Sequence, residues 1–165
     1  MLPGGMPERK APLTAILHAA AQVLDCDSAI LGRLSEDRHF LELSVGGTRA
    51  GLNVAAVETA LGFAVSGLRM PLTVTESILV RALRQERLFV SHDVAEVAGG
   101  ALPAEMMQAV RDIVGTRSYA VVPIIGRSGA LGVLFVDKAG QASFTSNERD
   151  TLLAYAERVG EALET

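Results

Sequence analysis

Tyr119-Ala-Val-Val-Pro-Ile-Ile125 opens the stretch of sequence that decides the fold, and Gly126-Arg-Ser-Gly129 and Ala130-Leu-Gly-Val-Leu-Phe-Val136 complete it. Both apolar runs have the length of a strand and are rich in β-branched residues. The four residues between them have the composition of a hairpin turn. The sequence therefore predicts two paired antiparallel strands in the core of a sheet.

A helix follows this hairpin. Phe144-Thr-Ser-Asn-Glu148 has the pattern of a capping box, in which Thr145 accepts a hydrogen bond from the amide of Glu148 and the glutamate side chain reaches back. The sheet is thus expected to end against a C-terminal helix.

The first half of the chain alternates in the same way between helix and strand patterns. Apolar residues at helical spacing predict an amphipathic helix that begins near Pro12, and residues 1–10 are expected to form a tail or linker. Residues 28–34 and 39–45 read as a hairpin. Asn53 is placed to cap a short helix that Gly62 ends, and residues 67–73 predict a third strand at an edge, interrupted by Pro71.

Three further elements precede the core hairpin. The patterns predict a helix over residues 76–85, a short strand over 88–90, and a helix that starts at Pro103 and ends at Gly115. The apolar side of the last helix is expected to use Leu102, Met106, Val110, Ile113 and Val114.

Size, charge and composition fit one cytoplasmic domain. The chain has 165 residues, one cysteine and a net charge of −4, so it can bury a substantial core without disulfides and lacks the basic surface that nucleic acid requires. No apolar run approaches the roughly 18 residues of a membrane span, and the start has no signal-peptide pattern.

The order of these motifs resembles the GAF domain family of small-molecule-sensing regulatory modules. The resemblance rests on Pro123, Gly132-Val-Leu, Asp137-Lys138 and Phe144, and it covers residues 11–165. It implies an α+β fold with a central antiparallel sheet of about six strands. Terminal helices are expected on one face, and short helices and loops over a ligand pocket on the other, with residues 91–116 as its roof.

The cyclic-nucleotide-binding branch of this family offers a residue-by-residue comparison. Lys138, Phe144 and Glu148 match its dispersed signature, whereas Asp137 and Arg149 depart from it. The resemblance implies that the matching three form a structural clasp, with Lys138 paired to Glu148, rather than ligand contacts. Ser28 and Thr116 match ligand-contacting positions by their place in the sequence. Ser44-Val45 replaces a Phe-Asp pair, which argues against tight cyclic-nucleotide binding.

The residues that other branches of the family use for catalysis or chromophore attachment are missing from this sequence. The methionine sulfoxide reductase branch needs a second thiol, and Cys26 is alone. Cys26 lies between two aspartates, which disfavours a thiolate, so a structural role is expected rather than attachment of a bilin. No Gly-rich phosphate loop, Ser-His-Asp arrangement or His/Cys metal cluster is present, and an enzyme is not expected. The sequence requires no cofactor.

Candidate ligand contacts remain near the expected pocket. They are Ser28, Arg69, His92, Asp93, Met106, Thr116 and Arg117. Each has a second interpretation: His92 beside Asp93 can cap a turn, the arginines can be solvated edge residues, and the methionine can be ordinary core.

The terminal helices suggest a dimer. Two sets of small or apolar residues are the candidates for the interface: Ala15, Ala19 and Val23 in the first helix, and Leu152, Ala156, Val159 and Leu163 in the last. The alternative is that both helices only cover their own sheet. The sequence thus leaves two functions: a homodimeric sensor that passes ligand state to a linked effector domain in a longer protein, or a structural dimerisation module whose pocket is filled.

Overall fold

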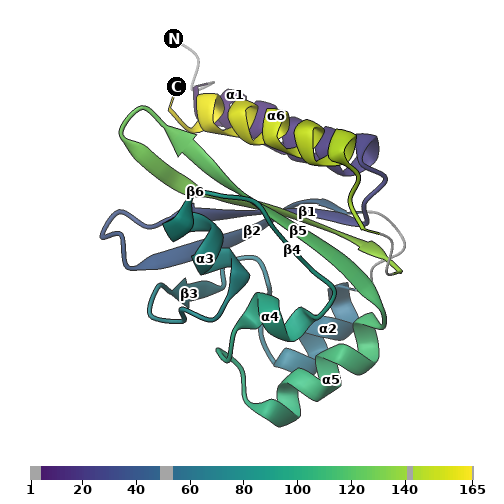
Figure 1. The fold of residues 1–165 in the computed structure, drawn as a ribbon. Coiled ribbons are helices and arrows are strands. Elements are labelled where there is room, and N and C mark those ends of the chain that lie inside the picture. Colours follow the sequence, from purple (N-terminus) through teal and green to yellow (C-terminus); the bar gives the residue numbers. More distant parts are fainter. Residues whose placement is uncertain (1–4, 49–53, 141–142, 165) are drawn as a thin grey trace.

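The computed structural model describes residues 5–48, 54–140 and 143–164 and contains one curved sheet (Figure 1). Its six strands are all antiparallel and follow the order β3-β2-β1-β6-β5-β4. The strands are β1 Ser28–Leu34, β2 Phe40–Thr48, β3 Arg69–Pro71, β4 Phe89–Ser91, β5 Arg117–Gly126 and β6 Gly129–Ala139. The predicted α+β architecture is confirmed.

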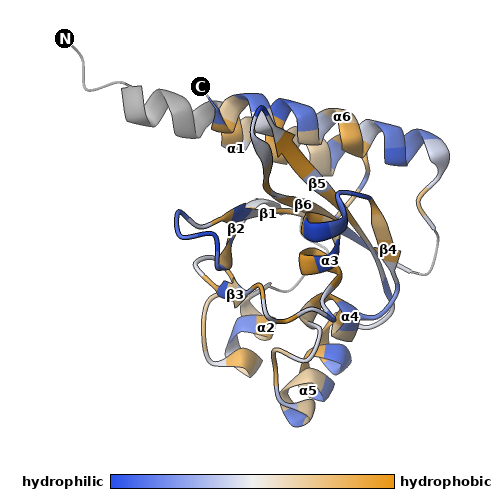
Figure 2. Ribbon diagram, turned by 60° about the vertical axis from the view of Figure 1, so that its left-hand side comes forward, coloured by the Kyte–Doolittle hydropathy of each residue, from blue (hydrophilic) through white to orange (hydrophobic). Residues whose placement is uncertain are grey.

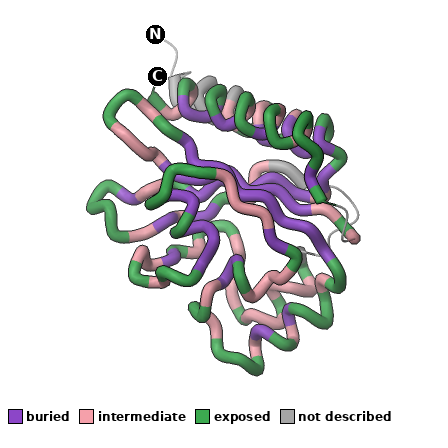
Figure 3. Tube along the Cα trace, viewed as in Figure 1, coloured by how far each residue is buried: buried purple, intermediate pink, exposed green. Residues whose placement is uncertain are grey.

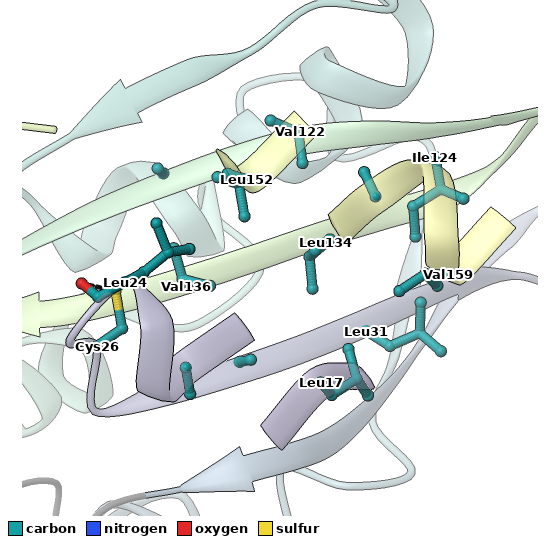
Figure 4. Close-up of a cluster of buried hydrophobic side chains, with 14 of the residues drawn as sticks. Leu17, Leu24, Cys26, Leu31, Val122, Ile124, Leu134, Val136, Leu152 and Val159 are labelled. Atoms are coloured by element: carbon teal, nitrogen blue, oxygen red, sulfur yellow. Dashed lines mark hydrogen bonds between the residues drawn. The ribbon is translucent and has the colours of Figure 1, made fainter. Parts of the chain in front are cut away.

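The two longest helices cover one face of the sheet. Helix α1 (Gly5–Val23) and helix α6 (Ser146–Leu163) lie side by side and antiparallel, so the start of α1 and the end of α6 are at the same end of the pair (Figure 1). Figure 4 shows how their inward side chains meet those of the central strands. Leu17, Leu134 and Val159 are at most 3% exposed in this layer, so burial of apolar area stabilises it.

The opposite face carries four shorter helices: α2 Val54–Leu61, α3 Ile78–Gln85, α4 Val94–Ala98 and α5 Ala104–Val114. In Figure 2 the strand β5 is predominantly hydrophobic, and in Figure 3 the central strands are buried where they pass between the two layers. Alternate residues of the strands supply the two faces. Val121 and Phe135 face the short helices, whereas Val122 and Leu134 face α1 and α6.

Local sequence explains most of the element ends. The capping box at Thr145 and Glu148 is present at the start of α6. Ser77 caps α3 through a hydrogen bond from the Leu79 amide, and Gly62, with φ 81°, follows α2 as predicted. Strand β4 pairs only with residues 119–121, so Pro123 lies beyond it and costs no hydrogen bond to β4.

Several elements differ from the predictions. Helix α1 begins at Gly5 and not near Pro12, because Pro7 falls in its first turn, where the amide has no intrahelical partner. The third strand shrinks from residues 67–73 to Arg69–Pro71. Helix α4 was not predicted, since five residues are too few to show a helical period. Asn53, the predicted cap of α2, lies outside the described residues.

Candidate functional site

A cavity of about 300 Å³ lies between the sheet and the short helices. Its walls come from β1, β2, β3, β5 and β6, from α2 and the residues after it, and from α3, α4 and α5. Almost all lining residues are apolar: Ile30, Leu43, Val45, Val57, Leu61, Phe63, Val65, Leu68, Met70, Pro71, Leu79, Val94, Val97, Ala98, Ala101, Leu102, Met107, Val110, Val114 and Phe135. The cavity can therefore hold a small molecule that buries mostly apolar surface.

Polar groups gather at one place on its sheet wall. Asp137 of β6 stands opposite Ser28 of β1 and opposite Tyr119 of β5 in the strand register, so the three residues form a row across the sheet. All three line the cavity and are at most 4% exposed. The only other polar residue of its described lining is Arg69.

Asp137 is held by two donors. The Ser28 hydroxyl donates to Oδ1, and Arg117 Nε donates to Oδ2 at 2.8 Å. Arg117 also forms an ion pair with Asp27 through its Nη2 atom. Burial raises the pKa of Asp137, while the hydrogen bonds from Ser28 and Arg117 oppose that rise. Burial alone would lower the pKa of Arg117, but the attraction of Asp137 and Asp27 outweighs it and raises that pKa.

Tyr119 supplies the other polar group of this row. Its ring is tilted against Phe135, with 6.5 Å between the ring centroids. Burial, followed by the nearby Asp137, raises the pKa of its hydroxyl. The hydroxyl is therefore a neutral hydrogen-bonding group at physiological pH.

The predicted ligand contacts separate into two groups. Ser28 and Arg69 line the cavity, whereas His92, Asp93, Met106, Thr116 and Arg117 do not. Met107 takes the place expected for Met106, because it shares a helix face with Val110 and Val114 at spacings of three and seven. Thr116 is exposed. Arg117 acts indirectly, through Asp137.

His92 and Asp93 have structural partners. Asp93 caps α4 by accepting from the Ala95 amide and pairs with Arg111 at 2.9 Å, and these contacts lower its pKa. His92 Nδ1 lies 3.0 Å from the Ser118 hydroxyl. Asp93 thus has the capping role that the sequence left open, whereas His92 joins the end of β4 to β5 through a side-chain contact.

The sequence missed most of the cavity wall, including Tyr119 and Asp137 as pocket residues. Tyr119 was counted as part of a core strand and Asp137 as a departure from a signature. Tyr119 lies two residues before Val121, and Asp137 lies two residues after Phe135, so each pair shares one face of its strand. This spacing was the signal available in the sequence, because it places Tyr119 and Asp137 on the face opposite α1 and α6. The roof is also wider than residues 91–116, since Val57, Leu61 and Phe63 contribute.

The three clasp residues lie together outside the cavity. Lys138 Nζ is 3.4 Å from Glu148 Oε2 and 4.4 Å from the centroid of the Phe144 ring. The Thr145 amide and, more weakly, Lys138 lower the pKa of Glu148. This contact fastens the end of β6 to the start of α6.

Two other predictions concern the opposite face. Leu152, Ala156 and Val159 are at most 3% exposed and pack on their own sheet, so their assignment to a dimer interface was wrong (Figure 4). Leu163 is partly buried against the same core, whereas Ala15 and Val23 are exposed and Ala19 is half-buried. Cys26 is fully buried, and burial raises its thiol pKa to about 12, which excludes a reactive thiolate at neutral pH.

Within the described ranges, no three His, Cys, Asp or Glu side chains are grouped to hold a metal ion. The same ranges contain no helix with the length and hydropathy of a membrane span.

Comparison with known proteins agrees with this geometry. The family model described as GAF domain matches residues 8–163. The chain belongs to the GAF domain family. The resemblance seen in the sequence is thereby confirmed, and the cavity occupies the face on which the GAF resemblance placed a ligand pocket.

Solved structures, among them GAF domains, share the fold at low sequence identity. The GAF domain of a phosphoenolpyruvate-protein phosphotransferase from Coxiella burnetii has a TM-score of 0.67 and 16% identity, covering 94% of this chain and 82% of that one. A methyl-accepting chemotaxis protein, residues 122 to 287, has a TM-score of 0.65 and 18% identity, covering 94% and 88%. The blue-light-absorbing form of the Thermosynechococcus elongatus PixJ GAF domain has a TM-score of 0.65 and 16% identity, covering 99% and 89%. A search of curated protein sequences finds no match.

Proposed function

We propose that this GAF domain is a cytoplasmic regulatory sensor. A small molecule occupies the cavity, the domain acts as a homodimer, and the terminal helices pass the ligand state to a linked effector domain in a longer protein. The proposed role is regulatory and not catalytic. The observation that carries the proposal is the apolar cavity of about 300 Å³, which lies at the lower end of the range for small-molecule sites.

The sheet offers a direct physical route from the cavity to the helices. Phe135 faces the cavity, while its neighbour Leu134 packs beneath α1 and α6 on the same strand. A close-packed core transmits displacements, so a ligand that shifts β6 also changes the support of the helix pair. Only a ligand that binds the two helix arrangements with different affinity can act as a signal.

The solved relatives support a signalling context. They include a chemotaxis protein and a domain of a two-component sensor histidine kinase. The alternative function, a dimerisation module with a filled pocket, is disfavoured by the open cavity.

A thermal-shift screen tests the proposal. The purified chain is heated with cyclic nucleotides, amino acids, aromatic acids, uncharged aromatic compounds or haem. A ligand at 100 times its dissociation constant adds about 2.7 kcal/mol, which raises the melting temperature by roughly 5–10 °C for a chain of this size.

Two variants locate the binding. Ala98→Phe adds a ring to the cavity wall and is expected to abolish the shift, whereas Ala154→Phe, on the exposed side of α6, is expected to retain it. If no class of compound raises the melting temperature, or if both variants show the same rise, binding in this cavity would be contradicted.

A further inference from the structure

The cavity wall contains a tyrosine hydroxyl that has no hydrogen-bond partner among the described residues. Tyr119 is 4% exposed, yet no described residue hydrogen-bonds to its Oη atom. Within the described residues, every side-chain nitrogen or oxygen that is sealed from solvent has a partner. The Tyr119 hydroxyl is therefore not sealed from solvent, and because Tyr119 lines the cavity, a ligand or water there can satisfy this hydroxyl.

The rest of the polar row is already satisfied internally. Asp137 accepts from Ser28 and from Arg117, and Arg117 is shared with Asp27. Of these groups only Ser28 and Asp137 line the wall, and the Ser28 hydroxyl donates to Asp137 rather than to a ligand. Tyr119 is thus the residue of this row whose polar group has no partner among the described residues.

The charge of the row disfavours an anion. Two carboxylates, Asp27 and Asp137, share the single guanidinium of Arg117. A carboxylate or phosphate bound beside Asp137 would lose its hydration and meet a like charge.

Arg69, the positively charged residue elsewhere on the wall, also has an acidic partner. Arg69 Nε lies 3.2 Å from Glu42 Oε2, and its guanidinium lies 4.2 Å from the centroid of the Phe40 ring. No described lining residue therefore offers a cation without an acidic partner.

We propose that the ligand of this cavity is a largely apolar molecule that carries no anionic group and has one hydroxyl or carbonyl group, which hydrogen-bonds to Tyr119 Oη. This inference rests on the proposed sensor function and narrows its ligand to one chemical class. It rules out cyclic nucleotides and aromatic carboxylates as tight ligands.

Three compounds that share one ring system test the class: 2-naphthol, naphthalene and 2-naphthoate. They differ only in carrying a neutral hydroxyl, no polar group or a carboxylate at neutral pH. The chain has no tryptophan, so the ring fluorescence of each compound can be titrated directly. We expect 2-naphthol to bind most tightly, naphthalene about 3–10-fold more weakly, and 2-naphthoate more weakly still, since one hydrogen bond contributes about 0.5–1.5 kcal/mol.

The two tyrosines of the chain provide a matched pair of variants. Tyr119→Phe keeps the ring and removes the hydroxyl, so it is expected to weaken 2-naphthol about 3–10-fold and to leave naphthalene unchanged. Tyr155→Phe, in α6 on the other face of the sheet, is expected to change neither.

The outcomes separate this inference from the sensor proposal. Equal or tighter binding of 2-naphthoate would overturn the ligand class, and unchanged 2-naphthol binding by Tyr119→Phe would overturn the role of Tyr119; both leave the open sensor pocket standing. Failure of all three compounds, together with flat curves in the wider thermal-shift screen, would overturn the sensor function itself.

Discussion

Asp137 shows how a single residue position depends on the whole sheet. Its carboxylate is buried beside Arg117 and Ser28, which precede it by 20 and 109 positions. The residue types were visible in the sequence, and Arg117 was a candidate for pairing with an anion. The partner could not be predicted, because it follows from the register of β1, β5 and β6 rather than from any local pattern.

Removing Arg117 tests how strongly this cluster is coupled. Arg117→Ala leaves Asp27 and Asp137 near each other without a cation, and loss of one member of a buried ion pair costs about 3–5 kcal/mol. Urea denaturation measures this loss. Arg111→Ala is the matched control, because its pair with Asp93 is roughly half exposed, and exposed ion pairs stabilise a fold far less than buried ones. Equal losses in the two variants would contradict the assignment.

The same variant has an expected pH dependence. Burial already raises the pKa of Asp137 in the folded chain, and Arg117 opposes that rise, so Arg117→Ala raises the pKa further. A folded state that binds the proton more tightly than the unfolded state becomes more stable as the pH falls. The stability deficit of Arg117→Ala is therefore expected to be smaller at about pH 5 than at about pH 8. A deficit that does not change with pH would show that lost packing dominates.

At the scale of elements, the helices and strands with strong local patterns were predicted well, and the short ones were not. The hairpin of β5 and β6 and the capping box of α6 follow from turn and cap chemistry close in sequence. Helix α5 was predicted with nearly correct ends, and Val110 is buried as predicted, but Met107 is buried in place of Met106. Tertiary packing chooses between neighbouring apolar residues, and helical spacing alone cannot.

Helix α4 depends on one glycine for its contact with α3. Gly99 ends α4 with φ 59°, and a Cβ there would lie 2.1 Å from the backbone nitrogen of Ser77, the residue that caps α3. Gly99→Ala is expected to cost more than about 2 kcal/mol, since it combines a left-handed backbone with a clash. It should also weaken ligand binding, because α4 forms part of the cavity wall. Thermal denaturation measures the first effect and the thermal-shift screen the second.

The next residue supplies the control for that prediction. Gly100 has φ 86°, but its nearest atom to an added Cβ is a side-chain oxygen at 3.8 Å. Gly100→Ala is expected to cost only about 1 kcal/mol, from backbone strain alone. A similar loss of stability in Gly99→Ala and Gly100→Ala would mean that the structure around Ser77 adjusts to the added Cβ without an energetic cost.

At the scale of the whole molecule, the order of layers could be predicted and the cavity could not. The family resemblance placed the terminal helices on one face and a pocket on the other, and the structure has this arrangement (Figure 1). The size and lining of the cavity depend on how α2 and α5, which are far apart in sequence, meet beside the sheet. The same whole-chain packing buries Leu152 and Val159, which a helical pattern alone could assign to either the core or a partner.

A homodimer formed through the terminal helices would therefore use the outer surface of the helix pair. Val23, at the end of α1, is 63% exposed and is the most exposed large apolar residue described. Val23→Lys is expected to weaken dimerisation at least tenfold, because it places a charge in the interface, while a cation suits a helix C-terminus and leaves the fold intact. Sedimentation velocity over a concentration series measures the dimer, and circular dichroism checks the fold. Ile113→Lys is the control, since Ile113 is 37% exposed on α5, on the opposite face of the sheet from α1 and α6, and is expected to leave the dimer unchanged. A chain that is monomeric throughout the series, or a dimer that Ile113→Lys dissociates and Val23→Lys does not, would exclude this helix surface as the interface.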